Sequence, residues 1–91
     1  MEAVTVHPRV SRVHPEISEE DVLDAWENCI CAVPRLDRAP SEYIALGVDA
    51  KGRLIEMISV RSQDGDWLVY HAMTPPTKKA LAELGFGRRP G

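Results

Sequence analysis

The chain has 91 residues, of which 44% are hydrophobic and 27% charged, and its formal net charge is −3. This length and composition predict one small globular domain spanning residues 1–91. No apolar run approaches the roughly 20 residues of a membrane-spanning helix, which argues against a membrane partner. The start, MEA, is acidic and leads into no hydrophobic segment, so we expect no signal peptide and a cytoplasmic location.

The acidic residues are unevenly distributed along the chain. Residues 16–27 hold six of the 14 acids and no base, so the remainder carries 11 bases against eight acids. The net charge by itself disfavours nucleic-acid binding, but a mildly basic surface elsewhere keeps that possibility open. The acid cluster is typical of a solvated helix face, and a partner site is the alternative.

The first third of the chain predicts a short strand and then a helix. Residues 4–7 are strand-like, and an irregular connection follows because two His-Pro pairs favour extended backbone. Ser18 is a good N-cap, with Asp21 three residues on and acids in the first turn. Apolar residues recur at helical spacing and predict a helix that Pro34 ends. These residues are Val22, Trp26, Cys29, Ile30 and Val33.

The two cysteines, Cys29 and Cys31, lie two positions apart. This spacing within one element does not suit a disulfide, and no second pair of ligands stands at the spacing of a zinc site. The three histidines are scattered along the chain. We therefore expect no metal and no cofactor, and interpret the cysteines as ordinary packing residues.

Three strand-like segments follow a polar loop at residues 35–42. YIALGV is joined to RLIEMISVR by the four-residue loop DAKG. RLIEMISVR is joined to DWLVYHAM by SQDG, whose Asp-Gly pair is typical of a hairpin. The segments predict an antiparallel meander.

A short helix is expected after the last strand. Thr74, Pro75 and Pro76 predict its cap and first turn, where a missing N–H costs nothing. Gly85 predicts its end. We expect residues 86–91 to form a flexible tail.

Strand alternation, combined with these even-length loops, places His71 directly opposite Glu56 on one face of the sheet. The other face is almost wholly apolar, so we expect it to receive the helices and form the core. A carboxylate beside the imidazole would orient the ring, and the pair could act in general acid–base catalysis. The alternative is a polar cross-strand contact on a solvated face. If the second turn is instead a two-residue Asp-Gly turn, the two groups become diagonal neighbours but stay on the same face. Only an odd loop or a β-bulge would separate them.

Four cations are the main candidates for phosphate or RNA contacts, and Arg9 and Arg12 on the N-terminal arm are further basic candidates. Lys78 and Lys79 lie in the first turns of the last helix, where positive charge opposes the helix dipole. This unfavourable placement suggests a functional role, such as binding phosphate. Arg53 and Arg61 flank the two predicted hairpin loops. The alternative for the lysines is ordinary surface charge.

Three large side chains share the predicted face of the histidine. Trp67, Tyr43 and Met73 alternate onto that face with the strand period. They are either cover for the sheet or a surface that binds a partner.

The order of these segments resembles a known family. An HP-rich start, a helix opening ISEEDV, the strands YIALGVD and GRLIEMISV, and a strand closing in YHAM before a helix resemble BrnT-like proteins. These belong to the RelE-like toxin superfamily of bacterial type II toxin–antitoxin systems, and the resemblance covers most of residues 9–84. It implies an α+β fold, with a small antiparallel meander of three or four strands and an N-terminal and a short C-terminal helix packed on one face.

The resemblance also implies a function. Such proteins cleave mRNA without a metal, on the open face of the sheet, and an antitoxin protein neutralises them. They place an arginine in a phrase like ISAR, whereas YHAM here has Met73 at that point and His71 two residues earlier. Pro75 and Pro76 stand where a base is expected in the following loop. These departures fit either a branch of the family that uses His71 for catalysis or a branch that has lost the ability to cleave RNA.

Two hypotheses follow. The first is a toxin-like, metal-independent endoribonuclease with His71 as acid/base and Glu56 as its partner, bound to RNA and to a cognate antitoxin. The second is a non-catalytic interaction module that binds a partner or forms a homodimer through the apolar open face.

Overall fold

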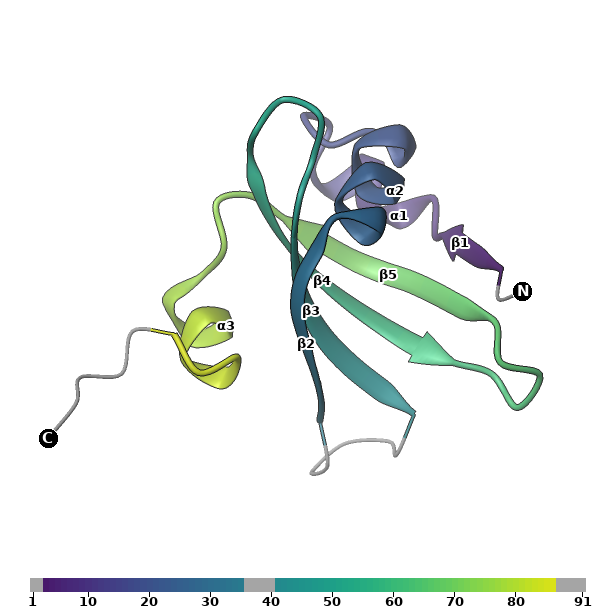
Figure 1. Cartoon of the computed structure of the whole chain (residues 1–91). Helices are drawn as coiled ribbons and strands as arrows, with labels where there is room; N and C mark the ends of the chain where they lie inside the picture. The colour runs from purple at the N-terminus through teal and green to yellow at the C-terminus, as the bar shows by residue number, and fades with distance from the viewer. Residues whose placement is uncertain (1–2, 36–40, 87–91) are drawn as a thin grey trace, which may run out of the picture.

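The computed structural model describes residues 3–35 and 41–86, which form an α+β fold of three helices and one five-stranded sheet. The strand order is β1-β5-β4-β3-β2, with β1 parallel to β5 and every other neighbouring pair antiparallel. The predicted meander is observed as β3, β4 and β5, with one more strand on each side (Figure 1). In chain order the elements are β1 (Val4–Val6), α1 (Arg9–Val13), α2 (Glu19–Glu27), β2 (Cys29–Pro34), β3 (Glu42–Val48), β4 (Leu54–Arg61), β5 (Trp67–Met73) and α3 (Lys78–Glu83).

Helix α2 begins at the predicted cap but ends earlier than predicted. Ser18 Oγ accepts the backbone N–H of Asp21 at 3.0 Å, and Asp21 Oδ2 accepts the N–H of Ser18 at 2.9 Å. At the other end, the Asn28 side chain donates to the Asp24 carbonyl oxygen. The prediction of a helix up to Pro34 is wrong. CICAVP is strand β2. Its residues pair with β3, and this pairing would be lost if α2 continued to Pro34.

The helices lie on both faces of the sheet, which corrects the expectation that they share one (Figure 1). Helices α1 and α2 cover the first face, where Val22 and Ala25 join a buried cluster with Met57. Helix α3 covers the second face and packs Ala80 into a separate cluster with Ile44. We refer to these as the α2 face and the α3 face. The core is therefore divided between two sides of one sheet.

The loop between β3 and β4 is one residue longer than predicted. Val48 pairs with Leu54, so residues 49–53 connect the strands. This odd length reverses the predicted faces of β4 relative to β3. Glu56 consequently pairs with Leu46 on the α3 face.

The connection from β4 to β5 differs from the prediction in two ways, and the two differences compensate each other. The Ser62 N–H donates to the Asp66 carbonyl oxygen at 2.8 Å, which leaves a three-residue loop where four residues were predicted. The register of β5 against β4 then shifts by one residue at Tyr70, a β-bulge immediately before His71. Because each change alone would move His71 to the opposite face, the two together return it to the face of Glu56.

Helix α3 begins three residues later than predicted. Its N-cap is Thr77, whose Oγ1 accepts the Ala80 N–H at 3.0 Å. Thr74, the predicted cap, instead donates its hydroxyl to the Leu54 carbonyl oxygen at 2.6 Å and anchors the segment that leads to the helix. Gly85 follows the end of the helix at φ 94°, which agrees with its predicted role.

Two expectations fall partly outside the described residues. The predicted loop at 35–42 includes residues 36–40, and the predicted tail at 86–91 includes residues 87–91. Among the helices in the described ranges, none has the length and apolar character needed to cross a membrane.

Candidate functional site

His71 and Glu56 are in direct contact on the α3 face. His71 Nε2 lies 2.9 Å from Glu56 Oε2, and the two side chains are 30% and 6% exposed, respectively. The carboxylate is therefore buried, while part of the imidazole reaches the surface. The residues are diagonal neighbours across the strands, since His71 pairs with Ile58 and Glu56 with Met73.

The second oxygen of Glu56 is also bonded. Oε1 accepts the backbone N–H of Thr77 at 2.7 Å, at the N-cap of α3. A buried carboxylate needs such partners to offset its lost hydration. Because both oxygens are fixed, Glu56 can hold the His71 ring in one orientation, which is what a catalytic imidazole requires.

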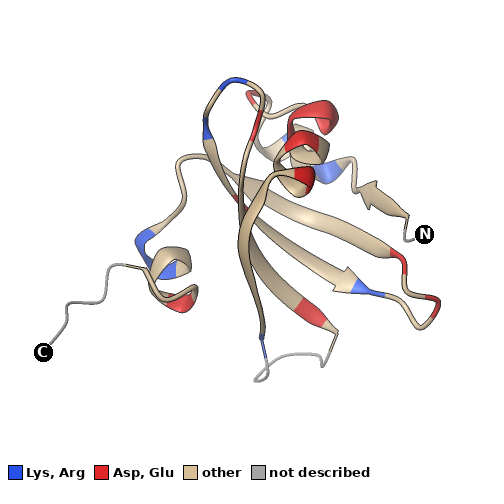
Figure 2. Cartoon of the chain, viewed as in Figure 1, with Lys and Arg blue, Asp and Glu red and all other residues tan. Residues whose placement is uncertain are grey.

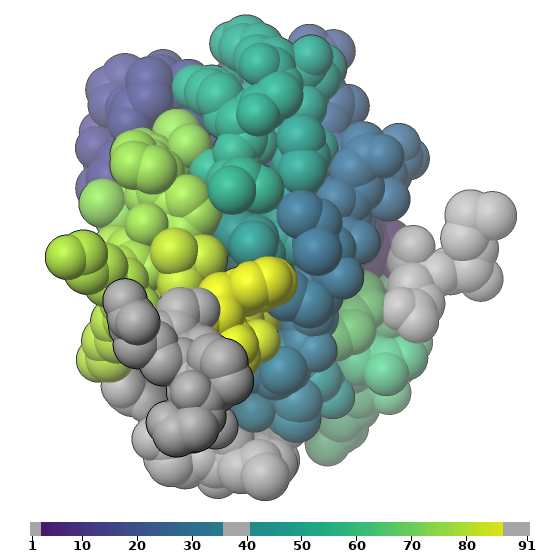
Figure 3. Space-filling model, turned by 60° about the vertical axis from the view of Figure 1, so that its left-hand side comes forward, coloured from purple at the N-terminus to yellow at the C-terminus, as the bar shows by residue number. Residues whose placement is uncertain are grey.

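A hollow of about 210 Å³ opens beside this pair on the α3 face. Helix α3 is drawn in yellow in Figure 3. The lining of the hollow includes Lys79, which is exposed, and an ion-paired cluster around Arg35. Arg35 Nε donates to Glu83 Oε2 at 2.7 Å, and its Nη1 donates to Glu42 Oε2 at 2.9 Å. Burial alone would lower the pKa of Arg35, but Glu83 and Glu42 outweigh it and raise the pKa above its usual value. Arg35 is thus a structural cation that ties α3 to β2 and β3.

A second imidazole, that of His14, lies close to the His71 ring. The His14 and His71 ring centroids are 6.4 Å apart and nearly perpendicular. His14 is 23% exposed, and with His71 and Arg9 it lines a small recess of about 20 Å³ between α1 and β5. Sequence reasoning missed His14 because only the packing of α1 against β5 brings it here, and no local pattern reports that contact.

The predicted phosphate contacts separate into two groups. Lys78 and Lys79 lie exposed at the start of α3, and Lys79 lines the same hollow as His71. Arg61 instead lies at the far end of β4 on the α2 face, with its guanidinium carbon 5.3 Å from the Trp67 ring centroid. Figure 2 shows the contrast between the acids gathered on α2 and the lysines on α3.

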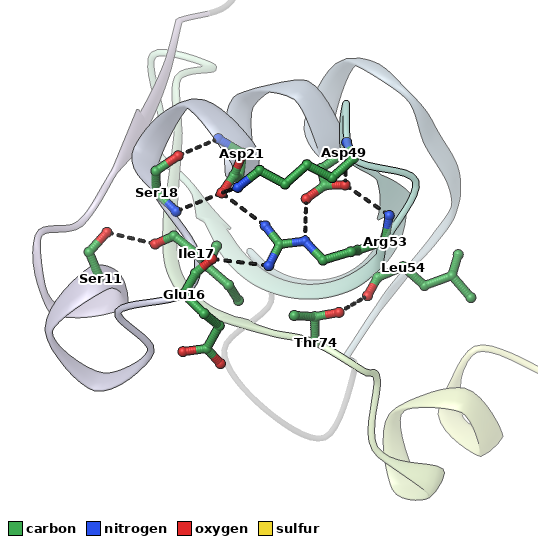
Figure 4. A network of polar contacts seen from close by, with 10 residues as sticks. Ser11, Glu16, Ile17, Ser18, Asp21, Asp49, Arg53, Leu54 and Thr74 are labelled. Atoms are coloured by element: carbon green, nitrogen blue, oxygen red, sulfur yellow. Dashed lines mark hydrogen bonds and ion pairs between the residues drawn. The ribbon is translucent and has the colours of Figure 1, made fainter.

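Arg53 belongs to a network that joins the β3–β4 loop to α2 (Figure 4). Its Nε donates to Asp49 Oδ2 at 2.8 Å, its Nη2 to Asp21 Oδ2 at 2.9 Å, and its Nη1 to the Glu16 carbonyl oxygen at 3.0 Å. Each guanidinium nitrogen is thus bonded within the fold. The structure does not bring Arg53 or Arg61 to His71.

The predicted partner surface is divided as well. Tyr43 and Trp67 contact each other on the α2 face, with ring centroids 5.0 Å apart. Met73 pairs with Glu56 and so lies on the α3 face. The prediction that all three share a face with His71 is wrong, because the odd β3–β4 loop and the bulge at Tyr70 alter the alternation.

Within the described ranges, no cluster of three or more His, Cys, Asp or Glu side chains is arranged to hold a metal ion. Cys29 and Cys31 are both free thiols on β2. The arrangement on the α3 face therefore offers acid–base groups and lysines.

Comparison with protein-family models, with curated proteins and with solved structures finds no match to this chain. Its function has to be argued from the site itself.

Proposed function

We propose that this protein is a toxin-like, metal-independent endoribonuclease of RelE type that acts on mRNA in the cytoplasm and is neutralised by a cognate antitoxin. The observation that supports this is the contact between His71 and Glu56, with the carboxylate buried and the ring partly exposed. An imidazole held by a fixed carboxylate at the edge of a hollow is an arrangement suited to proton transfer.

The chemistry needs one group to accept a proton and another to supply one. His71 removes the proton from a ribose 2′-hydroxyl, and the 2′-oxygen attacks the adjacent phosphorus as the bond to the 5′-oxygen breaks. His14, 6.4 Å away between ring centroids, supplies a proton to the leaving 5′-oxygen. The products are a 2′,3′-cyclic phosphate and a 5′-hydroxyl end, so atoms and charge balance without a metal.

Each further residue has a distinct role in this proposal. Glu56 is a positioning residue that acts through the ring of His71. Lys79 lines the hollow beside the pair, and Lys78 lies next to it on α3, so these two lysines contact the phosphates. Arg9 lines the recess shared by the imidazoles and provides a third cation.

The test is cleavage of an end-labelled mRNA by purified protein in the presence of EDTA, together with growth arrest on induced expression. His71→Ala should lower the cleavage rate at least ~100-fold, the usual scale of a general acid–base contribution, while circular dichroism stays unchanged. His7→Ala, at a histidine that accepts the Arg9 N–H outside the hollow, is the matched control. Wild-type cleavage by His71→Ala would refute the assignment.

Glu56→Gln tests the positioning role separately. The amide keeps the shape and can still accept the Thr77 N–H, so α3 should remain docked. The rate should fall by about tenfold with KM unchanged, because the carboxylate no longer orients the imidazole. A cleavage rate equal to that of the wild type, or a loss that appears only in KM, would contradict the proposed role of Glu56.

The alternative is a non-catalytic interaction module. It is favoured by the aromatic side chains of Trp67 and Tyr43, which line an open hollow on the α2 face. A stable homodimer or a co-purified partner, together with no cleavage by the wild-type protein, would support this reading.

A further inference from the structure

The α2 face contains a second hollow, separate from the His71 site. It has a volume of about 320 Å³ and is lined by residues of α2 and of the sheet. Its walls include Trp26 from α2, Trp67 from β5 and Tyr43 from β3. The Trp26 and Trp67 ring centroids are 5.2 Å apart and those of Tyr43 and Trp67 are 5.0 Å apart, so the rings form one continuous aromatic surface.

The lining is uncharged. Besides the three aromatic residues and Ser59, it consists of four smaller residues from β1, β2 and β3. One of these, Cys29, has a thiol that donates to the Cys31 carbonyl oxygen, and desolvation raises its pKa, so it stays neutral. An anionic group entering this hollow would lose its hydration without gaining a partner, and the Trp67 ring is already in contact with the Arg61 cation. These features favour a neutral ligand for the hollow.

One polar atom in the lining lacks a partner. Ser59 is 1% exposed, and its Oγ has no hydrogen-bond partner within the described chain. Ser59 pairs with Tyr43 on one side and Val69 on the other, which places it in the middle of the sheet. A buried hydroxyl without a partner is unfavourable and rare in folded proteins. A ligand with one hydrogen-bonding group would satisfy it.

We propose that this hollow binds a neutral, ring-bearing small molecule whose single polar group pairs with the Ser59 hydroxyl. The volume lies at the lower end of the usual range for ligand sites, about 300–1,000 Å³, and suits one ring with short substituents. Aromatic rings accept another ring in offset or edge-to-face contact. This site lies on the face opposite to the His71–Glu56 pair and does not depend on ribonuclease activity.

The chain offers a direct reporter for binding. Its only two tryptophans, Trp26 and Trp67, both line the hollow, so the two indole N–H signals in a ¹H–¹⁵N spectrum monitor occupancy. The probes are p-cresol and toluene, which differ by the hydroxyl. Titration with p-cresol should shift both signals saturably, and toluene should bind about fivefold more weakly, the scale of one hydrogen bond.

Two variants separate the hydroxyl from the shape of the hollow. Ser59→Ala should remove the preference for p-cresol over toluene, and Ser59→Leu should abolish binding of both by filling the space. Ser62→Ala, at an exposed serine of the next loop, should behave as the wild type.

The proposal is overturned if p-cresol gives no saturable shift, if toluene binds equally well, or if Ser59→Ala keeps the preference. It is also overturned if the indole signals of the free protein move on dilution, because a second copy would then cover the hollow.

Discussion

Replacing Asp49 with asparagine tests whether the Arg53 network holds the β3–β4 loop against α2. The Asp49 side chain is fully buried. Its Oδ1 accepts the N–H groups of Lys51 at 3.0 Å and Arg53 at 2.8 Å, and its Oδ2 accepts Arg53 Nε at 2.8 Å. Asp49→Asn keeps the shape and the Oδ1 acceptor, but it removes the charge and places an amide NH₂ against the Arg53 donor.

The size of the effect follows from these contacts. Removing one partner of a buried ion pair costs about 3–5 kcal/mol. The Arg53 side chain is 26% exposed and keeps its bond to Asp21, so water and the second carboxylate offset part of this loss. We therefore expect Asp49→Asn to lower the free energy of unfolding by about 2–3 kcal/mol at pH 7. For a domain of this size, that corresponds to a fall in Tm of roughly 10–20 °C.

The effect should depend on pH with a definite sign. Burial raises the pKa of Asp49, but hydrogen bonds from the Arg53 N–H and guanidinium outweigh it, so the pKa lies below its ordinary value. The backbone N–H of Ser18 is the largest cause that lowers the pKa of Asp21. A depressed carboxyl pKa contributes stability above the unfolded value near 3.9, which is lost as pH falls through the folded value. The wild type and Asp49→Asn should therefore converge in stability below about pH 4.

The assay is urea unfolding followed by tryptophan fluorescence, at pH 7 and at steps down to pH 3. Asp64→Asn is the matched control, because Asp64 is exposed in the β4–β5 loop. It should change the free energy of unfolding by less than about 0.5 kcal/mol. If Asp49→Asn is as stable as Asp64→Asn at pH 7, the network does not hold the loop as argued.

Two further substitutions test the packing of the helices. Gly47→Ala should lower the free energy of unfolding by about 2 kcal/mol or more in urea titrations, because its Cβ would lie 1.9 Å from the Ala25 carbonyl oxygen and force α2 away from β3. An unchanged midpoint would show that α2 does not pack this closely. Thr77→Ala should lower the free energy of unfolding by about 1 kcal/mol in thermal denaturation, since it removes the cap to the Ala80 N–H. Thr5→Ala, at an exposed residue of β1, is its control, and equal Tm values for the two variants would contradict the role of the cap.

Local signals in the sequence predicted the beginnings and ends of some elements well. Ser18 and Asp21 form the reciprocal cap expected at the start of α2, and Gly85 follows the end of α3 as expected. These features depend on hydrogen bonds and backbone angles within a few residues, so a local pattern is sufficient to find them.

The end of α2 could not be predicted in the same way. Trp26, Ile30 and Val33 satisfy a helical period, yet Ile30 and Val33 belong to β2. The strand is stabilised by its pairing with β3, a contact between distant parts of the chain that a single segment does not report. The division of the helices between two faces was missed for a related reason, because the loop lengths that set the faces were each misjudged by one residue.

The contact between His71 and Glu56 was predicted, but through a different route from the one observed. The prediction relied on a four-residue loop, whereas the chain reaches the same face by a three-residue loop and a bulge at Tyr70. His14 was not part of the prediction, because its place beside His71 depends on how α1 packs.

The compensating loop and bulge constrain how homologous chains can vary in length. A deletion or insertion of a single residue within the paired parts of β4 or β5 between Glu56 and His71, outside the turn and the bulge, would rotate one side chain to the far side of the sheet. A gap of two residues within the paired strands, or loss of the bulged Tyr70, would preserve the contact between Glu56 and His71. Related sequences that retain the histidine and the acid should therefore vary freely in length at the turn or the bulge, and only by even numbers of residues within the paired strands.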